Sequence, residues 1–267
     1  MNRLHKLLFI VLACSAQQAL GGTIINGSEV LANSLPYMAS VQHNGKHICG
    51  GFLIEENIVL TAAHCDKKEL TVVLGTNDLR LRKVKKTMRY NVEKCKHADF
   101  DKSSLANDIM TLTVRTYFSY FNPTFYVCYF LSRPSKMKPI KLPKNNMKIK
   151  NNTPCLVAGW GSIKTGGPTV DKLREVDVAT IDQRTCQKAW GRERLPAKTI
   201  CAGGYKTDKG FCQGDSGGPL VCSKMAVGIV SFYYNGTCDL PDLPNVYTEI
   251  KQFLPWINNP KRKCKID

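Results

Sequence analysis

Acidic side chains are scarce in this chain of 267 residues, which carries 21 Asp and Glu against 38 Lys and Arg and a formal net charge of +17. Such charge is typical of disordered polycations, but apolar stretches such as "NIVLTAAHC" and "MAVGIVSFYY" recur and exclude that class. The hydrophobic share of 43% is ordinary for a folded protein. The sequence shows no module that reads nucleic-acid bases, so we do not expect nucleic acid as a partner.

Long apolar runs are missing too, which excludes a membrane-spanning helix of ~20 residues. The short apolar run "LLFIVLA" near the start follows the basic segment "NRLHK" and precedes small residues. This order predicts a secretory signal peptide over residues 1–21, cleaved after Gly21. We therefore expect a secreted chain.

Cysteine, in contrast, is abundant, with 12 in the sequence. In a secreted chain this number predicts disulfides. Because Cys14 leaves with the signal peptide, eleven of the 12 remain. An odd number requires at least one free or intermolecular thiol.

From Ile24 onward, strand-length apolar stretches alternate with Gly, Asn and Pro, for example "YMASVQ", "GGFLI", "LTVVLG" and "CLVAGWG". This spacing predicts an all-β sandwich or barrel. The stretch "YTEIKQFLPWINN" instead has apolar residues at helical spacing and predicts an amphipathic C-terminal helix. A basic, mobile tail is expected over residues 259–267.

One segment fits neither pattern. Residues 114–136, "VRTYFSYFNPTFYVCYFLSRPSK", crowd aromatic rings into a stretch without clear strand boundaries. This segment is either an added loop or hairpin, or a flaw in the gene model.

Three short motifs carry the side chains that hydrolytic chemistry needs: "LTAAHC" contains His64, "NDIM" contains Asp108 and "GDSGGPL" contains Ser216. A serine hydroxyl is a poor nucleophile at neutral pH and requires a base within hydrogen-bond reach. Histidine supplies such a base because its unperturbed pKa lies near neutrality. The motifs, in the order His, Asp, Ser, resemble those of the chymotrypsin-like serine proteases, and the resemblance covers most of the chain from Ile24 to Ile257.

The resemblance implies an all-β fold of two six-stranded antiparallel β-barrels with the active site between them and a C-terminal helix. It assigns residues 24–142 to the N-terminal barrel, and residues 143–258 to the C-terminal barrel with the helix.

The same resemblance implies a role for each catalytic residue. Ser216 would be the nucleophile, His64 the general base, and Asp108 the group that orients and stabilises the histidine. The backbone N–H groups of Gly214 and Ser216 would form the oxyanion hole. Ser231 would support Asp108 and bind substrate backbone as an added strand.

The stretch "GGTIINGSEV" resembles the mature start of these proteases. By that resemblance Ile24 becomes the new N-terminus, and its α-ammonium pairs with the buried Asp215. His47 and Ser40 match positions that hold this aspartate in some zymogens of the family.

Thr23 precedes Ile24, so an activator with trypsin-like specificity would not cut there. Signal cleavage after Gly21 would leave an activation dipeptide, residues 22–23. This arrangement resembles the granule proteases (granzymes, mast-cell proteases and neutrophil elastase) and implies secretion or storage in a secretory or cytotoxic granule. Signal cleavage directly before Ile24 is the alternative.

The family pattern implies four disulfides: Cys49–Cys65, Cys155–Cys222, Cys186–Cys201 and Cys212–Cys238. It leaves Cys95, Cys128 and Cys264 without assigned partners.

The resemblance places Gly210 at the base of the S1 pocket, where trypsin-like members carry Asp, so we do not expect cleavage after Arg or Lys. Phe211 narrows the base, and Tyr233 and Asn245 replace glycines that keep the pocket open in chymotrypsin-like members. With Ser231, these four residues form the expected substrate-binding set. They predict a shallow apolar pocket for Ala, Val, Leu or Met, and a fully blocked pocket is the alternative.

The sequence thus predicts a secreted or granule-stored, non-tryptic serine endopeptidase with a Ser-His-Asp acyl-enzyme mechanism and no cofactor. Expected partners are protein or peptide substrates, serpin-type inhibitors and anionic glycosaminoglycans, which suit the basic clusters at residues 80–86, 136–144 and 261–265. The alternative is a catalytically weak cationic glycan-binding or antimicrobial protein on the same fold; the intact His, Asp and Ser argue against it.

The first basic cluster, "RLRKVKK", aligns with a loop that binds calcium through carboxylates in some relatives. Its side chains offer no such oxygen ligands, so we expect no metal site. Three sequons, at Asn26, Asn151 and Asn235, predict a glycoprotein, and Asn151 is the site we expect to be used.

Overall fold

The computed structural model describes residues 24–25, 27–80, 84–85, 88–115, 137–238, 243–259 and 261–265. Several predicted features lie outside these residues: the signal peptide, the dipeptide 22–23, Asn26, most of the basic cluster 80–86, and residues 116–136 with Cys128.

The first barrel is a closed antiparallel ring in the order β2-β3-β4-β7-β6-β5. Its strands are β2 (Met38–His43), β3 (Lys46–Glu55), β4 (Ile58–Thr61), β5 (Leu70–Leu74), β6 (Arg89–His97) and β7 (Met110–Arg115).

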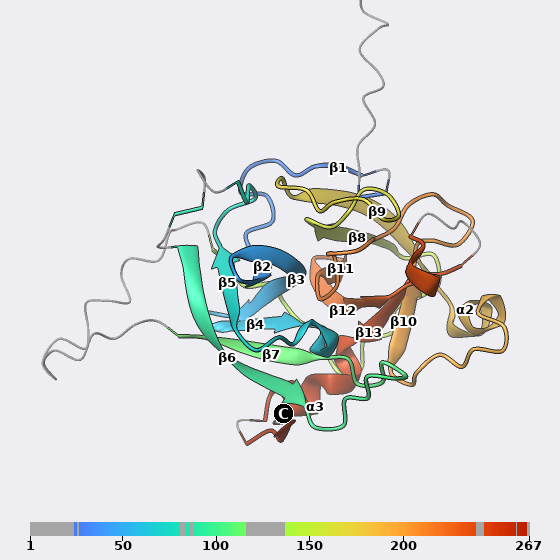
Figure 1. Cartoon of the computed structure of the whole chain (residues 1–267). Coiled ribbons are helices and arrows are strands. Elements are labelled where there is room, and N and C mark those ends of the chain that lie inside the picture. The colour runs from blue at the N-terminus through green and yellow to red at the C-terminus, as the bar shows by residue number, and fades with distance from the viewer. Residues whose placement is uncertain are drawn as a thin grey trace, which may run out of the picture.

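The second barrel closes in the order β8-β9-β10-β13-β12-β11. Its strands are β8 (Pro154–Gly159), β9 (Arg174–Ile181), β10 (Thr199–Ala202), β11 (Pro219–Cys222), β12 (Met225–Phe232) and β13 (Val246–Glu249). The predicted fold of two six-stranded antiparallel barrels is confirmed, and Figure 1 shows them side by side, β2–β7 in blue to green and β8–β13 in yellow to red.

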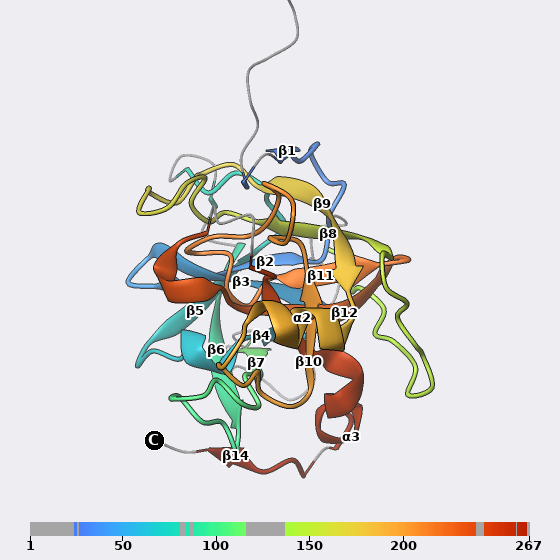
Figure 2. The same ribbon diagram turned by 90° about the vertical axis from the view of Figure 1, so that its right-hand side faces the viewer.

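Two-residue strands extend each barrel sheet. Strand β1 (Ser28–Glu29) pairs with β9, so the start of the described chain joins the second barrel. Strand β14 (Cys264–Lys265) pairs with β6 of the first barrel. The tail that we expected to be mobile is therefore held, and Figure 2 shows β14 at the end of β6, on the same side of the molecule as α3.

The barrel strands follow from the alternation of side chains along an extended chain. In β9 the buried Val176 and Val178 alternate with the exposed Asp177 and Ala179, because successive side chains point to opposite faces of a sheet. Each interior is a packed apolar cluster, in which burying one large side chain contributes roughly 1.5–3 kcal/mol.

The predicted C-terminal helix begins later than the sequence indicated. The first part of the predicted segment, up to Glu249, belongs to strand β13 (Val246–Glu249). The helical part consists of the 3₁₀ turn η6 (Ile250–Phe253) and α3 (Leu254–Ile257). Pro255 lies in the first turn of α3, where the missing N–H would have no intrahelical partner. Both short elements pack against the interior cluster of the first barrel.

A second helix, α2 (Gln183–Ala189), was not predicted. The carboxylate of Asp182 caps it by accepting a hydrogen bond from the backbone N–H of Thr185 at 2.9 Å. Among the described residues, no helix is long and apolar enough to cross a membrane.

The structure contains the four disulfides that the family pattern implies. Cys95 and Cys264, which had no assigned partners, form a fifth.

Candidate active site

His64 lies in the 3₁₀ turn η1 (Ala63–Cys65), directly after β4. Its backbone N–H donates to Asp108 Oδ1 at 2.9 Å, and its Nδ1 lies 2.7 Å from Asp108 Oδ2. Because an ionised carboxylate only accepts hydrogen bonds, Nδ1 carries the proton and Nε2 keeps a free lone pair. The imidazole is thus held in the tautomer that can accept a proton at Nε2.

Asp108 is fully buried, with 0% of its surface exposed. Besides its bonds to His64, its Oδ2 accepts a bond from Ser231 Oγ at 2.6 Å, and its carbonyl oxygen accepts one from Thr248 Oγ1 at 2.8 Å. Ser231 and Thr248 belong to the second barrel, on β12 and β13. Both barrels therefore fix the position of this one aspartate, and Thr248 is a contributor that the sequence did not indicate.

Ser216 lies on the loop before β11, beside the turn that carries His64. Its carbonyl oxygen accepts a hydrogen bond from Gly50 N–H at 2.8 Å and lies 3.8 Å from Cys65 Sγ. Within the described part of the chain, no hydrogen bond joins His64 to Ser216. In unliganded active sites such bonds are often long and tighten only when substrate binds.

Two neighbouring backbone N–H groups at Ser216 are held in fixed directions. Gln213 O accepts from Ser162 N–H at 2.6 Å, and Asp215 O accepts from Gly218 N–H at 2.9 Å. Since C=O and N–H point in opposite directions across a trans peptide, these bonds orient the N–H groups of Gly214 and Ser216. Among the described residues, neither N–H has a backbone acceptor, so both can bind a developing oxyanion.

Gly214 has a φ of +94°, which L side chains rarely adopt, and a Cβ there would lie 2.8 Å from Thr169 Cγ2. Only glycine fits, so the glycine of "GDSGG" is needed for the direction of this donor.

Asp215 is buried in a cradle of backbone groups. Its Oδ1 accepts from Gly161 N–H at 2.7 Å and its Oδ2 from Cys212 N–H at 2.9 Å. A Cβ on Gly159 would lie 2.0 Å from its Oδ1, so a side chain cannot be accommodated there. Burial raises the pKa of Asp215 to about 7, against the opposing effect of the two backbone bonds.

The segment from Ile24 enters this part of the second barrel. Ile24 is 1% exposed, and Ile25 forms an antiparallel bridge with Gly210. The predicted partners of the activation switch are thus both buried in the described structure.

His47 does not hold Asp215, the role that its match to zymogen positions suggested. Its Nε2 donates to Gly214 O at 2.9 Å, and its Nδ1 accepts from Ser40 Oγ at 2.8 Å. Burial lowers the pKa of His47 to about 4, although the bond to Gly214 opposes that shift. In this structure the histidine fixes the peptide that follows the predicted oxyanion-hole donor of Gly214.

The base of the predicted S1 pocket is occupied by Asn245. Its Oδ1 lies 2.2 Å from where a Cβ on Gly210 would stand and accepts a bond from Phe211 N–H at 3.3 Å. Asn245 is 3% exposed. It therefore fills the space of a pocket-base side chain with a neutral amide.

Aromatic rings pack beside this predicted pocket base. Phe211 is 1% exposed, with its ring centroid 5.1 Å from Tyr247 and 5.8 Å from Tyr233, both edge to face. Tyr233 also packs against Ile25 and the Cys212–Cys238 disulfide. Burial raises the pKa of the Tyr233 phenol, as does the nearby Asp215.

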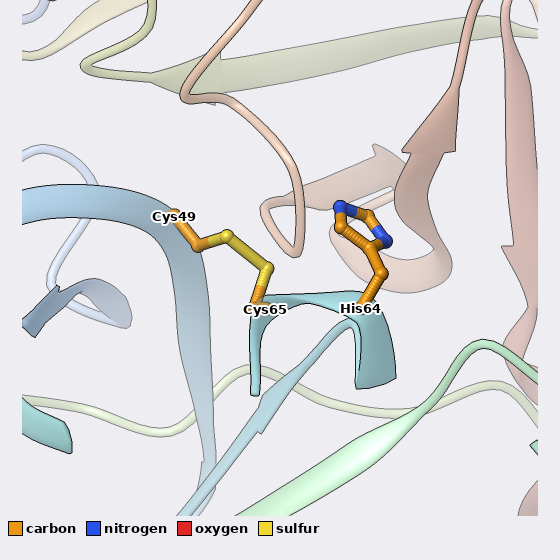
Figure 3. A group of neighbouring side chains, drawn as sticks. All are labelled: Cys49, His64 and Cys65. Carbon is orange, nitrogen blue, oxygen red and sulfur yellow. A yellow bond between two sulfur atoms is a disulfide. The ribbon is translucent and has the colours of Figure 1, made fainter. Parts of the chain in front are cut away.

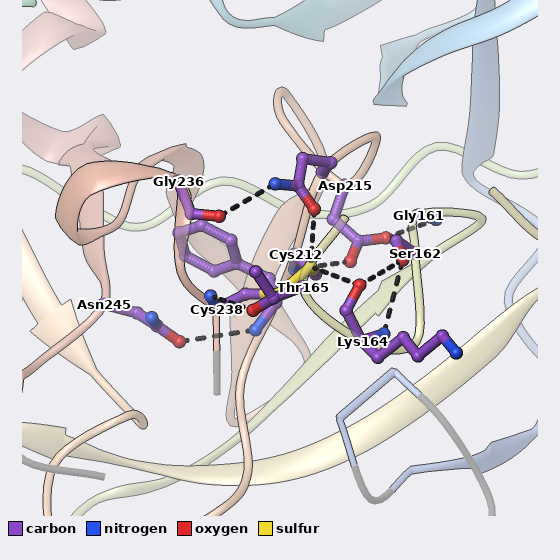
Figure 4. Close-up of a disulfide and its surroundings, with 11 residues drawn as sticks. Gly161, Ser162, Lys164, Thr165, Cys212, Asp215, Gly236, Cys238 and Asn245 are labelled. Atoms are coloured by element: carbon purple, nitrogen blue, oxygen red, sulfur yellow. Dashed lines mark hydrogen bonds between the residues drawn. A yellow bond between two sulfur atoms is a disulfide. The ribbon is translucent and has the colours of Figure 1, made fainter. Parts of the chain in front are cut away.

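A further contact joins the two pocket walls, as Figure 4 shows around the Cys212–Cys238 disulfide. Gln213 Nε2 donates to Gly236 O at 2.9 Å. This bond joins the loop that contains Ser216 to the segment that follows β12. This bond was not predicted from the sequence, although Gln213 directly precedes the serine motif.

Next to this pocket lies a groove of about 500 Å³ between the two barrels. Leu105 of the first barrel lines one side, and Trp190, Phe232, Tyr233 and Tyr234 line the other. Trp190 contacts Phe232 and Tyr234 edge to face, with centroids 5.5 and 5.9 Å apart. The groove is thus aromatic on one wall, and Ser103, Glu193 and Arg194 add polar groups to its lining.

Cys49, His64 and Cys65 offer possible ligand atoms within 4.8 Å of one another. Figure 3 shows that the two sulfur atoms are bonded to each other. Since metal-binding cysteines are thiolates, this group does not form a metal site; the disulfide braces the turn that carries His64.

Comparisons with known proteins identify the family. The trypsin family model matches residues 24–257. Granzyme B of Rattus norvegicus is 35% identical over 263 residues, covering 97% of this chain and 99% of the relative. For duodenase-1 of Bos taurus the identity is 37%, covering 97% and 96%, and for cathepsin G of Homo sapiens it is 34%, covering 100% and 97%.

Among solved structures, neuropsin, a serine protease expressed in the limbic system of mouse brain, matches with a TM-score of 0.71 and 30% identity. The match covers 86% of this chain and 96% of the neuropsin chain. Fold and site together define a chymotrypsin-like serine protease, a hydrolase of peptide bonds. The chain belongs to the trypsin family, and within it to the granzyme and cathepsin G group.

Proposed function

We propose that this protease acts through Ser216, His64 and Asp108. Ser216 Oγ attacks the scissile carbonyl while His64 Nε2 takes the hydroxyl proton, and Asp108 stabilises the imidazolium that forms. The N–H groups of Gly214 and Ser216 bind the oxyanion. The His64 proton then passes to the leaving amine, and a water repeats the cycle to release the acyl group.

The observation that carries this proposal is the 2.7 Å contact between His64 Nδ1 and the fully buried Asp108. It leaves Nε2 as the basic nitrogen on the side of the Ser216 loop.

A fluorophosphonate probe tests the proposal, because it reacts only with an activated serine. Protein beginning at Ile24 should be labelled, and the Ser216→Ala variant should not. A folded wild-type sample that stays unlabelled contradicts the mechanism.

For activation, we propose that removal of the chain before Ile24 frees an α-ammonium that pairs with Asp215. The burial of both residues supports this step, and a secretory or granule pathway would provide the processing. Protein that starts at Ile24 should react with the probe much faster than protein that keeps residues 22–23.

For specificity, we propose a small or medium apolar P1 residue. Asn245 brings no charge to the pocket base, and Phe211 and Tyr233 leave little depth above it. A peptide library scanned at P1 should show cleavage after Ala, Val, Leu or Met. Strong cleavage after Arg or Lys contradicts this reading.

The narrowed pocket also supports a second candidate, a catalytically weak cationic binding protein on the same fold. That protein would cleave no member of the P1 library while still eluting from immobilised heparin only at high salt. We propose anionic glycosaminoglycans and serpin-type inhibitors as partners in either case; the exposed Lys138, Lys141, Lys144, Lys261 and Lys263 supply charge for the former.

We also propose that Asn151 carries an N-glycan on the secreted protein. It is exposed, on a turn whose second residue, Asn152, has a φ of +57°. A loss of mass after glycosidase treatment, absent in Asn151→Gln, tests this assignment.

A further inference from the structure

The disulfide Cys95–Cys264 closes a long loop through the molecule, joining residues 169 positions apart. Cys95 lies on β6 of the first barrel, and Cys264 lies on β14, after the chain has completed the second barrel. Figures 1 and 2 both show the C-terminal tail returning to the first barrel beside α3. The other four disulfides each link segments of a single barrel.

Cys95 is linked to the region of Asp108 through the pairing of strands in the first barrel. In the pairing of β6 with β7, Cys95 stands opposite Thr111, one step from the pair of Lys96 with Met110. At the next position the N–H of His97 donates to the carbonyl of Ile109 at 3.1 Å. The strand that carries Cys95 therefore holds the chain immediately after Asp108.

The tail that carries Cys264 is linked to the same aspartate through α3, η6 and strand β13 of the second barrel. Trp256 Nε1 donates to Lys263 O at 3.2 Å, which ties the tail to α3. Elements α3 and η6 pack into the interior of the first barrel, and η6 begins directly after β13. Strand β13 carries Thr248, whose Oγ1 donates to the carbonyl of Asp108 at 2.8 Å.

Exposure distinguishes this disulfide from the other four. Cys264 is exposed and Cys95 is partly exposed, whereas the other eight disulfide cysteines are each at most 6% exposed. Attack by a thiolate requires access to a sulfur atom. A small thiol therefore meets Cys95–Cys264 first.

We propose that Cys95–Cys264 is a covalent clamp that positions Asp108 between the two barrels, and that external thiols lower catalysis by opening it. Opening consumes two thiols: the first displaces one cysteine thiolate and forms a mixed disulfide, and the second releases the other cysteine and yields the oxidised thiol dimer. Disulfide exchange in reverse restores the clamp. The inference rests on the proposed catalytic role of Asp108.

The first test uses the wild-type protein starting at Ile24 in graded reduced glutathione, followed by alkylation and mapping by mass spectrometry. Cys95 and Cys264 should be alkylated before any other disulfide cysteine. At that stage kcat and the rate of fluorophosphonate labelling should both fall about tenfold, since small displacements of catalytic groups are costly, while KM stays within about twofold. Oxidised glutathione should restore both rates.

The second test uses Cys95→Ser/Cys264→Ser, with Glu93→Ser as the matched control at an exposed position of β6, two residues before Cys95. The double variant should show the same lowered kcat in the absence of thiol and no further response to it, whereas Glu93→Ser should behave as wild type.

Three results would overturn the clamp: alkylation of a buried pair first, unchanged kcat and labelling rate after Cys95–Cys264 is open, or a loss of thermal stability alone. If the double variant does not fold, reduction of the wild-type protein still tests whether opening Cys95–Cys264 lowers kcat. Failure of the proposed mechanism looks different, because the untreated wild type would then not be labelled at all.

Discussion

At the scale of single residues, Asp108 depends on donors from both barrels, and Ser231 is the donor to its carboxylate from the second. Removing the hydroxyl leaves a buried carboxylate with one bond fewer, which typically costs about 1.5–3 kcal/mol for a charged acceptor. Ser231→Ala should therefore lower the free energy of unfolding by that amount, measured by urea denaturation at pH 7.5.

The matched control is Ser103→Ala. Ser103 Oγ also donates to a carboxylate, that of Asp101, at 2.8 Å, but on the surface. Its loss should cost less than about 1 kcal/mol. Equal effects for the two variants would show that burial of Asp108 does not strengthen its bond to Ser231.

His47 should make the protein sensitive to acid. Its pKa is about 4 in the fold against 6.5 for the free side chain, so the unfolded chain binds a proton first as the pH falls. The free energy of unfolding is then unaffected by protonation of His47 above pH ~6.5. It falls progressively toward pH ~4, by on the order of 3 kcal/mol. In His47→Gln this part of the loss should vanish in unfolding curves taken from pH 7.5 to 4.

The control for that measurement is His97→Gln. Burial also lowers the pKa of His97, but this histidine stands between Phe253 and Trp256, away from Gly214. Only the His47 variant should also slow labelling by the fluorophosphonate probe, because only His47 holds the peptide beside the oxyanion hole. An unchanged labelling rate would mean that Gly214 does not need this support.

At the scale of elements, the segment after β12 carries Tyr233, whose ring packs against Phe211, and we propose that this segment sets the depth of the S1 pocket. Tyr233→Gly should admit large apolar side chains and raise kcat/KM for substrates with Phe at P1 by at least about tenfold. Tyr234→Gly is the matched control, since Tyr234 is 38% exposed and faces the groove. A P1 profile of Tyr233→Gly that matches wild type would place the restriction elsewhere, at Gln213 or Asn245.

The sequence predicted much of this architecture, because motif and alternation are local properties. The barrels follow from alternating strands such as β9. Of the three motifs, those of His64 and Asp108 are joined by hydrogen bonds, and the backbone of Ser216 lies beside Cys65. The sequence could not indicate the bond from Gln213 to Gly236 or the bond from Thr248 to Asp108. Each joins residues far apart in the chain, and neither residue type is distinctive at its position.

The tail illustrates the same limit. Its basic composition indicated mobility, yet β14 pairs with β6 and Cys264 bonds to Cys95. Composition describes how a segment interacts with water, whereas a disulfide depends on which second cysteine lies within reach. The sequence left Cys95 and Cys264 without assigned partners, and no local pattern indicated that they bond to each other.

At the scale of the whole molecule, processing before Ile24 should remove a loss of stability that Asp215 causes as the pH rises. In the unprocessed chain the pKa of Asp215 is raised from 3.8 to about 7, so the fold binds a proton that the unfolded chain has lost. Stability is then greatest below pH ~4 and falls as the pH rises to ~7, by on the order of 4 kcal/mol.

A free Ile24 ammonium would stabilise the ionised carboxylate of Asp215 and so remove this loss of stability. The effect should last until the ammonium deprotonates near pH ~8. Urea unfolding at several pH values measures how the free energy of unfolding changes with pH. It should be carried out on proteins starting at Gly22 and at Ile24, each with its Asp215→Asn variant. Parallel curves for the two starting points would contradict pairing between Ile24 and Asp215.

The division of the site between the barrels has a consequence for how such a protease can change. Residues 24–115 include His64 and Asp108, the pair that we propose moves protons, whereas residues 137–259 include Ser216, the two proposed N–H donors and the side chains proposed for the S1 pocket. Substitutions in the later half of the coding sequence can therefore alter which peptide bond is recognised without touching the proton-transfer pair. Cleavage preference is thus open to selection separately from acid–base chemistry, except at Ser231 and Thr248, whose hydroxyls hold Asp108.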